Sequence, residues 1–424
     1  MKSIINSSLL KTSGIYTIAN IINSAIPFLL LPILTTCLSP GDYGIVSMFT
    51  VLLSVFMPIV SLNIFTSVTR KYYDKDKRFN IYLSTAFVLL IISTFIVSMF
   101  VIVFSDSISK FTSFPEQSLY LIIVAAFGNS LVSITLSLWQ VREKAFFYGL
   151  FQVLQTLMNL VLSIVFVVSL GMNWQGRVNA QVIAITIFAV VGLIIIIKRE
   201  KPSLKYDKSY AKDIISYGVP LIPHTIGMVL INMTDRIFIT NMVGIEATGV
   251  YTVGFQIGMI IMVLQDSFNK AWTPYLFKKL NEVNLRIKKN IVKITYLYFA
   301  LIILSALVLS AITPIIVRVF IGDSFAESVH YVFWIALGFA FNGMYKMVSG
   351  VIFYNKKTHI LSYITFITAM VNVVLNYILI KVNGTIGASQ ATFLAFFISF
   401  ILTWIIANKV YPMPWSIFKK ERIT

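Results

Sequence analysis

Long apolar blocks alternate with short polar segments along the whole chain of 424 residues. Blocks such as 81–104 and 178–197 hold about twenty residues each, the length of helix that crosses a hydrocarbon core of about 30 Å. Inside a block, apolar residues follow one another without the two-residue alternation of a barrel strand. A helix satisfies its own backbone hydrogen bonds in lipid, so the pattern predicts an all-α integral membrane protein.

The apolar blocks predict about 12 transmembrane helices, whose ends are set to within a few residues by the flanking polar positions. Their expected ranges are 13–36, 45–68, 81–104, 118–140, 148–169, 178–197, 214–239, 249–268, 291–313, 328–349, 360–380 and 386–407.

Basic residues concentrate in every second segment that connects the apolar blocks. Most of the 34 Lys and Arg residues lie in both termini and in the segments around 70–78, 142–144, 198–212, 270–289 and 356–357. The opposite loops hold only Lys110, Arg177, Arg318 and Lys381. Because basic loops are retained in the cytoplasm, we expect an even number of spans with both termini in the cytoplasm.

Composition agrees with this topology. Hydrophobic residues make up 58% of the chain and charged residues only 12%, too few for the surface of a soluble domain of this length. The excess of basic residues follows from the topology, so no nucleic-acid partner is expected. Cys37 is the one cysteine and the three histidines lie on separate segments, which excludes an internal disulfide and leaves no metal-ligand spacing.

Weak internal similarity divides the chain into an N-terminal half (1–200), a cytoplasmic linker (201–213) and a C-terminal half (214–424). An offset of six spans preserves orientation, so the sequence predicts two parallel six-helix halves around a central cavity. Transporters built in this way bind their substrate between the halves and rock to alternate access. Chance similarity between apolar segments is the alternative. Gly14 and Gly44 in the first half correspond to Gly218 and Gly249 in the second half. Later in each half, Asn159 and Gly171 correspond to Asn372 and Gly384.

Several motifs in these halves resemble the polysaccharide transporter branch of the multidrug/oligosaccharidyl-lipid/polysaccharide exporter superfamily, most closely O-antigen flippases. The resemblance covers nearly the whole chain. The residues that carry it are Pro27, Pro32, the run LSPGDYG at 38–44, the run YGVPLIP at 217–223, Asp235-Arg236, the run GVY at 249–251, Lys356-Lys357-Thr358, Asn372, Asn376 and the run NGTIGA at 383–388.

The resemblance implies a flippase of the bacterial inner membrane. Its expected cargo is an undecaprenyl-diphosphate-linked oligosaccharide repeat unit, of the O-antigen or capsule type, moved from the cytoplasmic to the periplasmic leaflet. The family performs no covalent chemistry, so the resemblance implies neither an enzyme nor a cofactor. Membrane lipids are expected neighbours, and the polymerase and chain-length machinery of the same pathway are candidate partners.

Two other functions stay open on the sequence. A multidrug cation antiporter of the same superfamily would need an acidic cavity, whereas the polar residues inside these spans include at least as many cations as anions. An O-antigen polymerase or membrane glycosyltransferase generally resembles chains with one large periplasmic loop, and every predicted loop here is short.

The seventh span carries four candidate cavity residues, which are His224, Asn232, Asp235 and Arg236. His224, Asn232 and Asp235 fall broadly on one helix face, and Arg236 lies at its edge. An arginine suits a phosphate through its two-pronged guanidinium, so Arg236 is a candidate for binding the lipid diphosphate or an acidic sugar. A buried structural pair with Asp235 is the equally weighted alternative.

Other intramembrane polar residues extend the candidate site. In the tenth span, Asn342 and Lys346 are one turn apart, and Lys346 is either a cavity cation or reaches toward the cytoplasmic interface. In the eighth span, Asp266 and Lys270 have the spacing of a helix-end ion pair. Polar stripes at helical spacing predict either a hydrated cavity wall or hydrogen bonds between helices. The stripe residues are Gln152, Gln155, Asn159 and Ser163 in the fifth span, and Thr365, Thr368, Asn372 and Asn376 in the eleventh.

Overall fold

The computed structural model describes residues 22–23, 25–26, 28–74, 76–203, 205–281, 284–355 and 357–415, and these are almost entirely helical. Ten helices in this part are long and apolar enough to cross a membrane, and the number is eleven when the pair Lys208–Gly227 with Asn232–Met242, bent by 57°, is counted as one span. The helix Phe28–Cys37 is the described end of the first predicted span, and the rest of that span lies outside the described residues except for 22–23 and 25–26. The predicted all-α membrane fold is confirmed.

Residue contacts divide the chain into two compact units, 1–241 and 242–424. This boundary falls at the end of the seventh predicted span, whereas the predicted linker, 201–213, precedes that span. The seventh span therefore packs with the first unit. The division into two six-helix halves rests on the order of the spans rather than on packing, and it stays a prediction.

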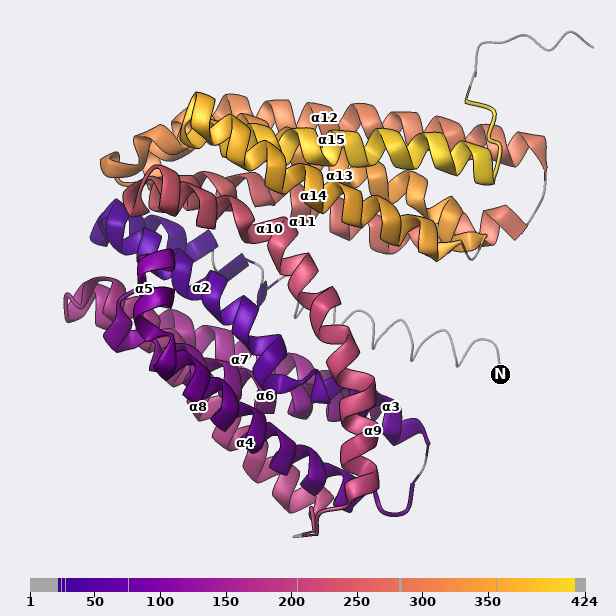
Figure 1. Cartoon of the computed structure of the whole chain (residues 1–424). Coiled ribbons are helices and arrows are strands. Elements are labelled where there is room, and N and C mark those ends of the chain that lie inside the picture. Colours follow the sequence, from indigo (N-terminus) through magenta and orange to yellow (C-terminus); the bar gives the residue numbers. More distant parts are fainter. Residues whose placement is uncertain are drawn as a thin grey trace, which may run out of the picture. The chain divides into compact units, whose positions relative to one another are not determined.

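The helices of the first unit follow the predicted spans closely (Figure 1). Local chemistry sets the start of α2, where the Ser39 hydroxyl accepts the backbone N–H of Asp42 and the Asp42 carboxylate accepts that of Ser39. Such a reciprocal pair satisfies N–H groups that have no partner inside the helix. The elements are α2 (Pro40–Ser61), α3 (Ile64–Tyr73), α4 (Phe79–Val103), α5 (Ser105–Thr112), η1 (Glu116–Ser118), α6 (Tyr120–Val141), α7 (Ala145–Ile164), the π-helical turn η2 (Val165–Ser169), α8 (Asn173–Glu200), α9 (Lys208–Gly218), η3 (Val219–Leu221) and α10 (Ile222–Met242).

The predicted span 45–68 is interrupted near its C-terminal end. Leu62 and Asn63 both adopt the left-handed backbone conformation, with φ of 47° and 49°, which ends α2 and begins α3. This conformation is uncommon for residues with a side chain. Gly218, at the end of α9, lies so close to the break that a Cβ atom there would overlap the Leu62 carbonyl oxygen. The break is a tertiary feature, so the hydropathy pattern does not reveal it.

A network of charged and aromatic side chains binds α9 to the first unit. Asp207 caps the start of α9. The Arg70 guanidinium donates to Asp213 Oδ2 at 2.6 Å, and the Tyr82 hydroxyl donates to the same oxygen at 2.9 Å. Figure 1 shows α9 beside α3, the helix that carries Arg70. The second part of the predicted linker is thus a helix docked on its own unit.

In the second unit, α13 lies between α11, α12 and α15, and α14 packs along α15 (Figure 1). α13 is buried along most of its length, while α12 and α14 leave many apolar side chains exposed, as helices that face lipid do. The elements are α11 (Ile245–Asn281), α12 (Leu285–Phe320), η4 (Asp323–Ser328), α13 (Val329–Tyr354), α14 (Thr358–Asn383) and α15 (Thr385–Val410).

The expectation of a hydrophilic loop at 269–290 is wrong. α11 has 37 residues and α12 has 36, so each is about 55 Å long and exceeds the hydrocarbon core of about 30 Å. Trp272, Leu276 and Leu280 are spaced four residues apart and are all buried. This apolar stripe packs the extension of α11 within the second unit, although its other residues are polar enough to resemble a loop.

Candidate functional site

Three predicted site residues lie on one stretch of α10. Asp235 and Arg236 are buried, with 3% and 7% of their surfaces exposed. The Arg236 guanidinium donates through Nη1 to the backbone oxygen of Asn232 at 3.0 Å and to Asp235 Oδ1 at 3.3 Å. The cation is therefore paired with a carboxylate of its own helix, and an anionic ligand at Arg236 would compete with Asp235 for the guanidinium.

His224 has a different setting near the start of α10. Its side chain is exposed. No cluster of three His, Cys, Asp or Glu side chains that could hold a metal ion occurs in the part of the chain that the structure describes. A role of His224 as a cavity residue stays a prediction.

The polar stripe of α7 faces partly into the first unit. Gln152 and Gln155 are half-buried, and the Gln152 side-chain oxygen is buried without a hydrogen bond from any described residue. Further along the same face, Asn159 is half-buried and Ser163 is fully buried. The stripe therefore has polar groups both with and without a protein partner, as a face that also meets water or a ligand would.

Arg177 of α8 forms hydrogen bonds with the polar stripe of α7. It lies in the second turn of α8, and its Nη1 donates to Asn159 Oδ1 at 2.9 Å and to Ser163 Oγ at 3.3 Å. These partners are neutral, and no carboxylate pairs with Arg177 among the residues that the structure describes. Arg177 is thus a half-buried cation that no described carboxylate balances, beside amide and hydroxyl groups that suit sugar hydroxyls.

Sequence reasoning placed Arg177 in an outer loop because the sixth apolar block begins at Val178. The structure begins α8 earlier, at Asn173, which turns Arg177 into a helical residue. A signal was present in the chain, since the polar stripe of α7 ends at Ser163, only a short connection away from Arg177. Pairing that stripe with the nearest cation would have suggested the contact.

The second unit holds a separate polar cluster where α11 meets α13. Gln265 Nε2 donates to Asn342 Oδ1 at 3.0 Å, and Lys346 Nζ donates to Asp266 Oδ1 at 2.5 Å. Gln265 is fully buried, whereas the side chains of Lys346 and Asp266 are 26% and 41% exposed. The structure therefore brings the predicted pair Asn342 and Lys346 together with two neighbouring residues of α11.

The prediction that Asp266 forms a helix-end ion pair with Lys270 is wrong. Asp266 forms its ion pair with Lys346 of α13, because α11 and α13 pack closely at this level. Spacing along one helix identifies only the partner within that helix, and a neighbouring helix supplies a better-placed cation.

Asn376 occupies the centre of the α14 packing face. It is fully buried, and its Nδ2 donates to the Asn372 backbone oxygen at 2.9 Å and to Asn372 Oδ1 at 3.1 Å. The Asn376 Oδ1 atom is buried and receives no hydrogen bond from the described residues. Contact of Asn376 with a ligand stays a prediction.

Comparison with known sequences adds family relationships to this geometry. The family described as "Polysaccharide biosynthesis protein" matches residues 9–280, and the family MatE matches residues 220–378. An "Uncharacterized membrane protein" of Haemophilus influenzae is 26% identical over 369 residues, covering 86% of this chain and 88% of that protein. The "Lsg locus putative protein 1" of the same organism is 25% identical over 374 residues, covering 86% and 89%.

Solved structures share the fold. The "Lipid II flippase MurJ, inward closed conformation" superposes with a TM-score of 0.75 at 14% identity, covering 93% of this chain and 87% of that chain. The inward-facing "multidrug resistance MATE family transporter of the MOP superfamily" gives a TM-score of 0.69 at 15% identity, covering 93% and 94%. At these identities the likeness concerns the fold alone.

Proposed function

Because the chain belongs to the family of polysaccharide biosynthesis proteins, we propose that it is a flippase for undecaprenyl-diphosphate-linked oligosaccharide repeat units. In this proposal the cargo moves from the cytoplasmic to the periplasmic leaflet of a bacterial inner membrane by alternating access, with both termini in the cytoplasm. The shared fold with a protein named as a lipid II flippase supports it.

The observation that carries the proposal is the charge balance of the intramembrane polar residues. Arg236 is paired with Asp235, and Lys346 is paired with Asp266. Arg177 is hydrogen-bonded only to neutral side chains among the described residues. A charge in a membrane span is expensive unless it serves a ligand or a partner, and an unbalanced guanidinium favours an anionic cargo such as a diphosphate.

The alternating-access part of the proposal uses the two predicted six-helix halves, 1–200 and 214–424. Within it, Arg236, Asp235, Asn232 and His224 from the first unit are candidate cavity residues, as are the α7 residues Gln152 and Gln155. The second unit would add Asn342, Lys346 and Asn376. Polymerase and chain-length proteins of the pathway remain proposed partners.

A multidrug cation antiporter is the second candidate, and the MatE match over residues 220–378 favours it. A site for cationic drugs needs carboxylates that are free to receive them. Asp235 and Asp266 are each held by a cation of the protein, so the described charges favour the flippase.

A polymerase or glycosyltransferase has less support. In the described part of the chain, the longest connection between helices is the segment 201–207, which leaves no room there for a catalytic loop domain.

Deletion of the gene tests the proposed function. The mutant is expected to retain repeat units that are accessible only from the cytoplasmic side, and a plasmid copy should restore surface polysaccharide. Normal surface polysaccharide in a deletion strain without a second flippase would refute the proposal. Efflux of cationic dyes by the same strains separates the two candidates, because only the antiporter predicts that deletion abolishes efflux.

A further inference from the structure

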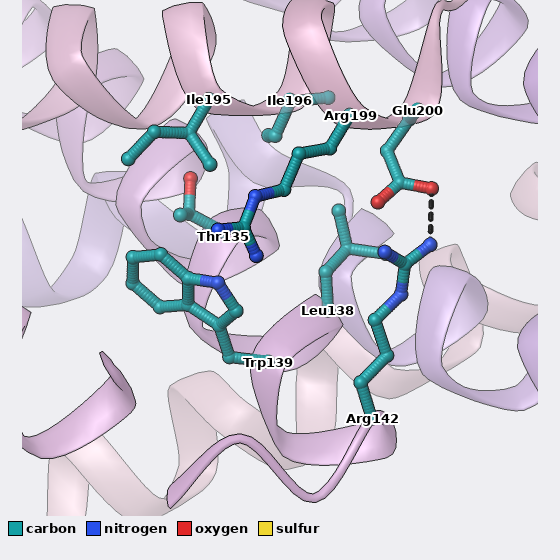
Figure 2. Close-up of a pocket in the computed structure, with 8 residues that line it drawn as sticks. All are labelled: Thr135, Leu138, Trp139, Arg142, Ile195, Ile196, Arg199 and Glu200. Carbon is teal, nitrogen blue, oxygen red and sulfur yellow. Dashed lines mark hydrogen bonds and ion pairs between the residues drawn. The ribbon is translucent and has the colours of Figure 1, made fainter. Parts of the chain in front are cut away.

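A pocket opens between the last turns of α6 and α8, away from the polar stripe of α7 (Figure 2). It is a shallow hollow that is partly open to the surroundings. Leu138 and Ile195 form apolar walls, and Trp139 lies at the base with 5% of its surface exposed. Three charged side chains line the same pocket, namely Arg142, Arg199 and Glu200.

The charged side chains leave one guanidinium available. Arg142 Nη2 donates to Glu200 Oε2 at 2.5 Å, and the Glu200 side chain is only 8% exposed. Arg199 is exposed and has no ion pair in the described part of the chain, and its guanidinium lies 5.6 Å from the centre of the Phe147 ring. Figure 2 shows the Arg199 side chain extending across the pocket toward Thr135 and Trp139.

Arg142 contributes a further unused donor. Its Nε atom is buried and finds no acceptor among the described residues. A buried donor without an acceptor destabilises the protein unless a ligand or water satisfies it. The pocket therefore combines a net positive charge of one with an unsatisfied guanidinium N–H.

Exposed apolar side chains lie close to the pocket in α7 and α8. The Phe147 ring of α7 lies 6.3 Å from the Trp139 ring between centres and is 42% exposed. Its neighbour Phe146 is 61% exposed, and Ile194 and Ile197, next to the lining residues Ile195 and Ile196 in the sequence, are 46% and 51% exposed. On helices that cross a bilayer, such side chains contact acyl chains, while arginine and tryptophan lie at the level of the headgroups. A molecule that fits has an apolar tail beside an anionic head.

We propose that this pocket binds the phosphate of an anionic glycerophospholipid, with Arg199 as the principal ligand and Arg142 as a second donor. A zwitterionic headgroup fits less well, because Glu200 is already held by Arg142 and is not available to an ammonium group. The residues that line the pocket are not among the proposed cargo-binding residues, so lipid binding is tested separately from the proposed cargo.

The test uses the full-length purified protein in detergent. Phosphatidylglycerol and phosphatidylethanolamine are titrated separately, and bound lipid is counted by native mass spectrometry. Phosphatidylglycerol is expected to bind more tightly, and Arg199→Gln should weaken it about tenfold, as expected for loss of a charge-assisted hydrogen bond. The matched control is Lys198→Gln, which removes the same charge from the next residue of α8 outside the pocket, and it should change binding less than about twofold.

A second variant tests the carboxylate. Glu200→Gln releases the Arg142 guanidinium and should strengthen phosphatidylglycerol binding. Equal weakening by Arg199→Gln and Lys198→Gln would overturn the proposal, because it would reveal diffuse surface attraction. Displacement of the lipid by millimolar inorganic phosphate would also overturn it, since the site would then be one for a soluble anion. Equal binding of the two lipids would refute the preference for an anionic headgroup.

Discussion

The Arg177 guanidinium of α8 donates a hydrogen bond to the side-chain oxygen of Asn159 on α7, over 2.9 Å. The contact fixes the orientation of an arginine that has no carboxylate partner in the described structure. A guanidinium held by neutral groups keeps its full charge and its remaining N–H donors for a ligand. Arg177 therefore joins Arg236 and Lys346 as a candidate for contact with an anionic cargo.

Replacement of Arg177 by glutamine should reduce export of surface polysaccharide at least about tenfold, because a charge-assisted hydrogen bond is lost. Export is measured in the complemented deletion strain, with membrane abundance measured in parallel. Lys381→Gln removes an exposed cation from the end of α14 and should leave export unchanged. Normal export by Arg177→Gln would restrict Arg177 to a packing role.

Variants of the ion pair between Lys346 and Asp266 test whether Lys346 only stabilises the fold or also binds the cargo. Lys346→Ala and Asp266→Ala should each lower the free energy of unfolding by about 1 kcal/mol, because the pair is partly exposed. The charge-swapped double variant, Lys346→Asp with Asp266→Lys, should recover thermal stability. If Lys346 also contacts the cargo, export stays low in the double variant. Recovery of both stability and export would show that the pair is structural only.

Hydropathy predicted most spans to within a few residues, because a bilayer imposes one length and one polarity on every helix that crosses it. The α11 extension escaped prediction because its buried stripe, Trp272 with Leu276 and Leu280, lies among basic residues. The partners of Asp266 and Arg177 lie on other helices. Hydropathy carries no information on which helix faces which, so such pairs follow only from the packed structure.

Gly343 marks a close approach between three helices of the second unit. A Cβ atom at this position would lie 2.6 Å from Tyr298 Oη of α12 and 2.7 Å from Gln265 Oε1 of α11. Gly343→Ala should therefore lower the free energy of unfolding by about 1–3 kcal/mol through overpacking. The measurement is the thermal unfolding midpoint of the purified protein.

Gly227→Ala is the matched control for this prediction. A Cβ atom there would meet nothing within 4 Å, and alanine is favoured over glycine inside a helix by about 0.5–1 kcal/mol. The control should leave the midpoint unchanged or raise it. A Gly343→Ala midpoint equal to that of the control would show that Tyr298 and Gln265 can move aside.

Asp76 links the segment after α3 to α9. Its carboxylate accepts the backbone N–H of Arg78 at 2.9 Å and the hydroxyl of Tyr210 at 2.7 Å, and it lies 3.1 Å from Lys71 Nζ. The Arg78 hydrogen bond is the main cause that lowers the pKa of Asp76 from 3.8 to about 2, followed by the bond from Tyr210. Asp76 is thus charged and hydrogen-bonded in the folded protein at any neutral or mildly acidic pH.

A depressed pKa stabilises the folded state fully above the unfolded value of 3.8, and this stabilisation is lost as the pH falls through about 2. Thermal midpoints of the wild type and of Asp76→Asn should differ by a constant amount from about pH 7 to pH 5, begin to converge below about pH 4 and meet as the pH falls to about 2. Asp74→Asn is the control, because the Asp74 side chain is 48% exposed and lies 3.4 Å from Lys71 Nζ, and it should show little difference throughout. Convergence already at pH 6 would contradict the assignment of this stabilisation to the Asp76 carboxylate.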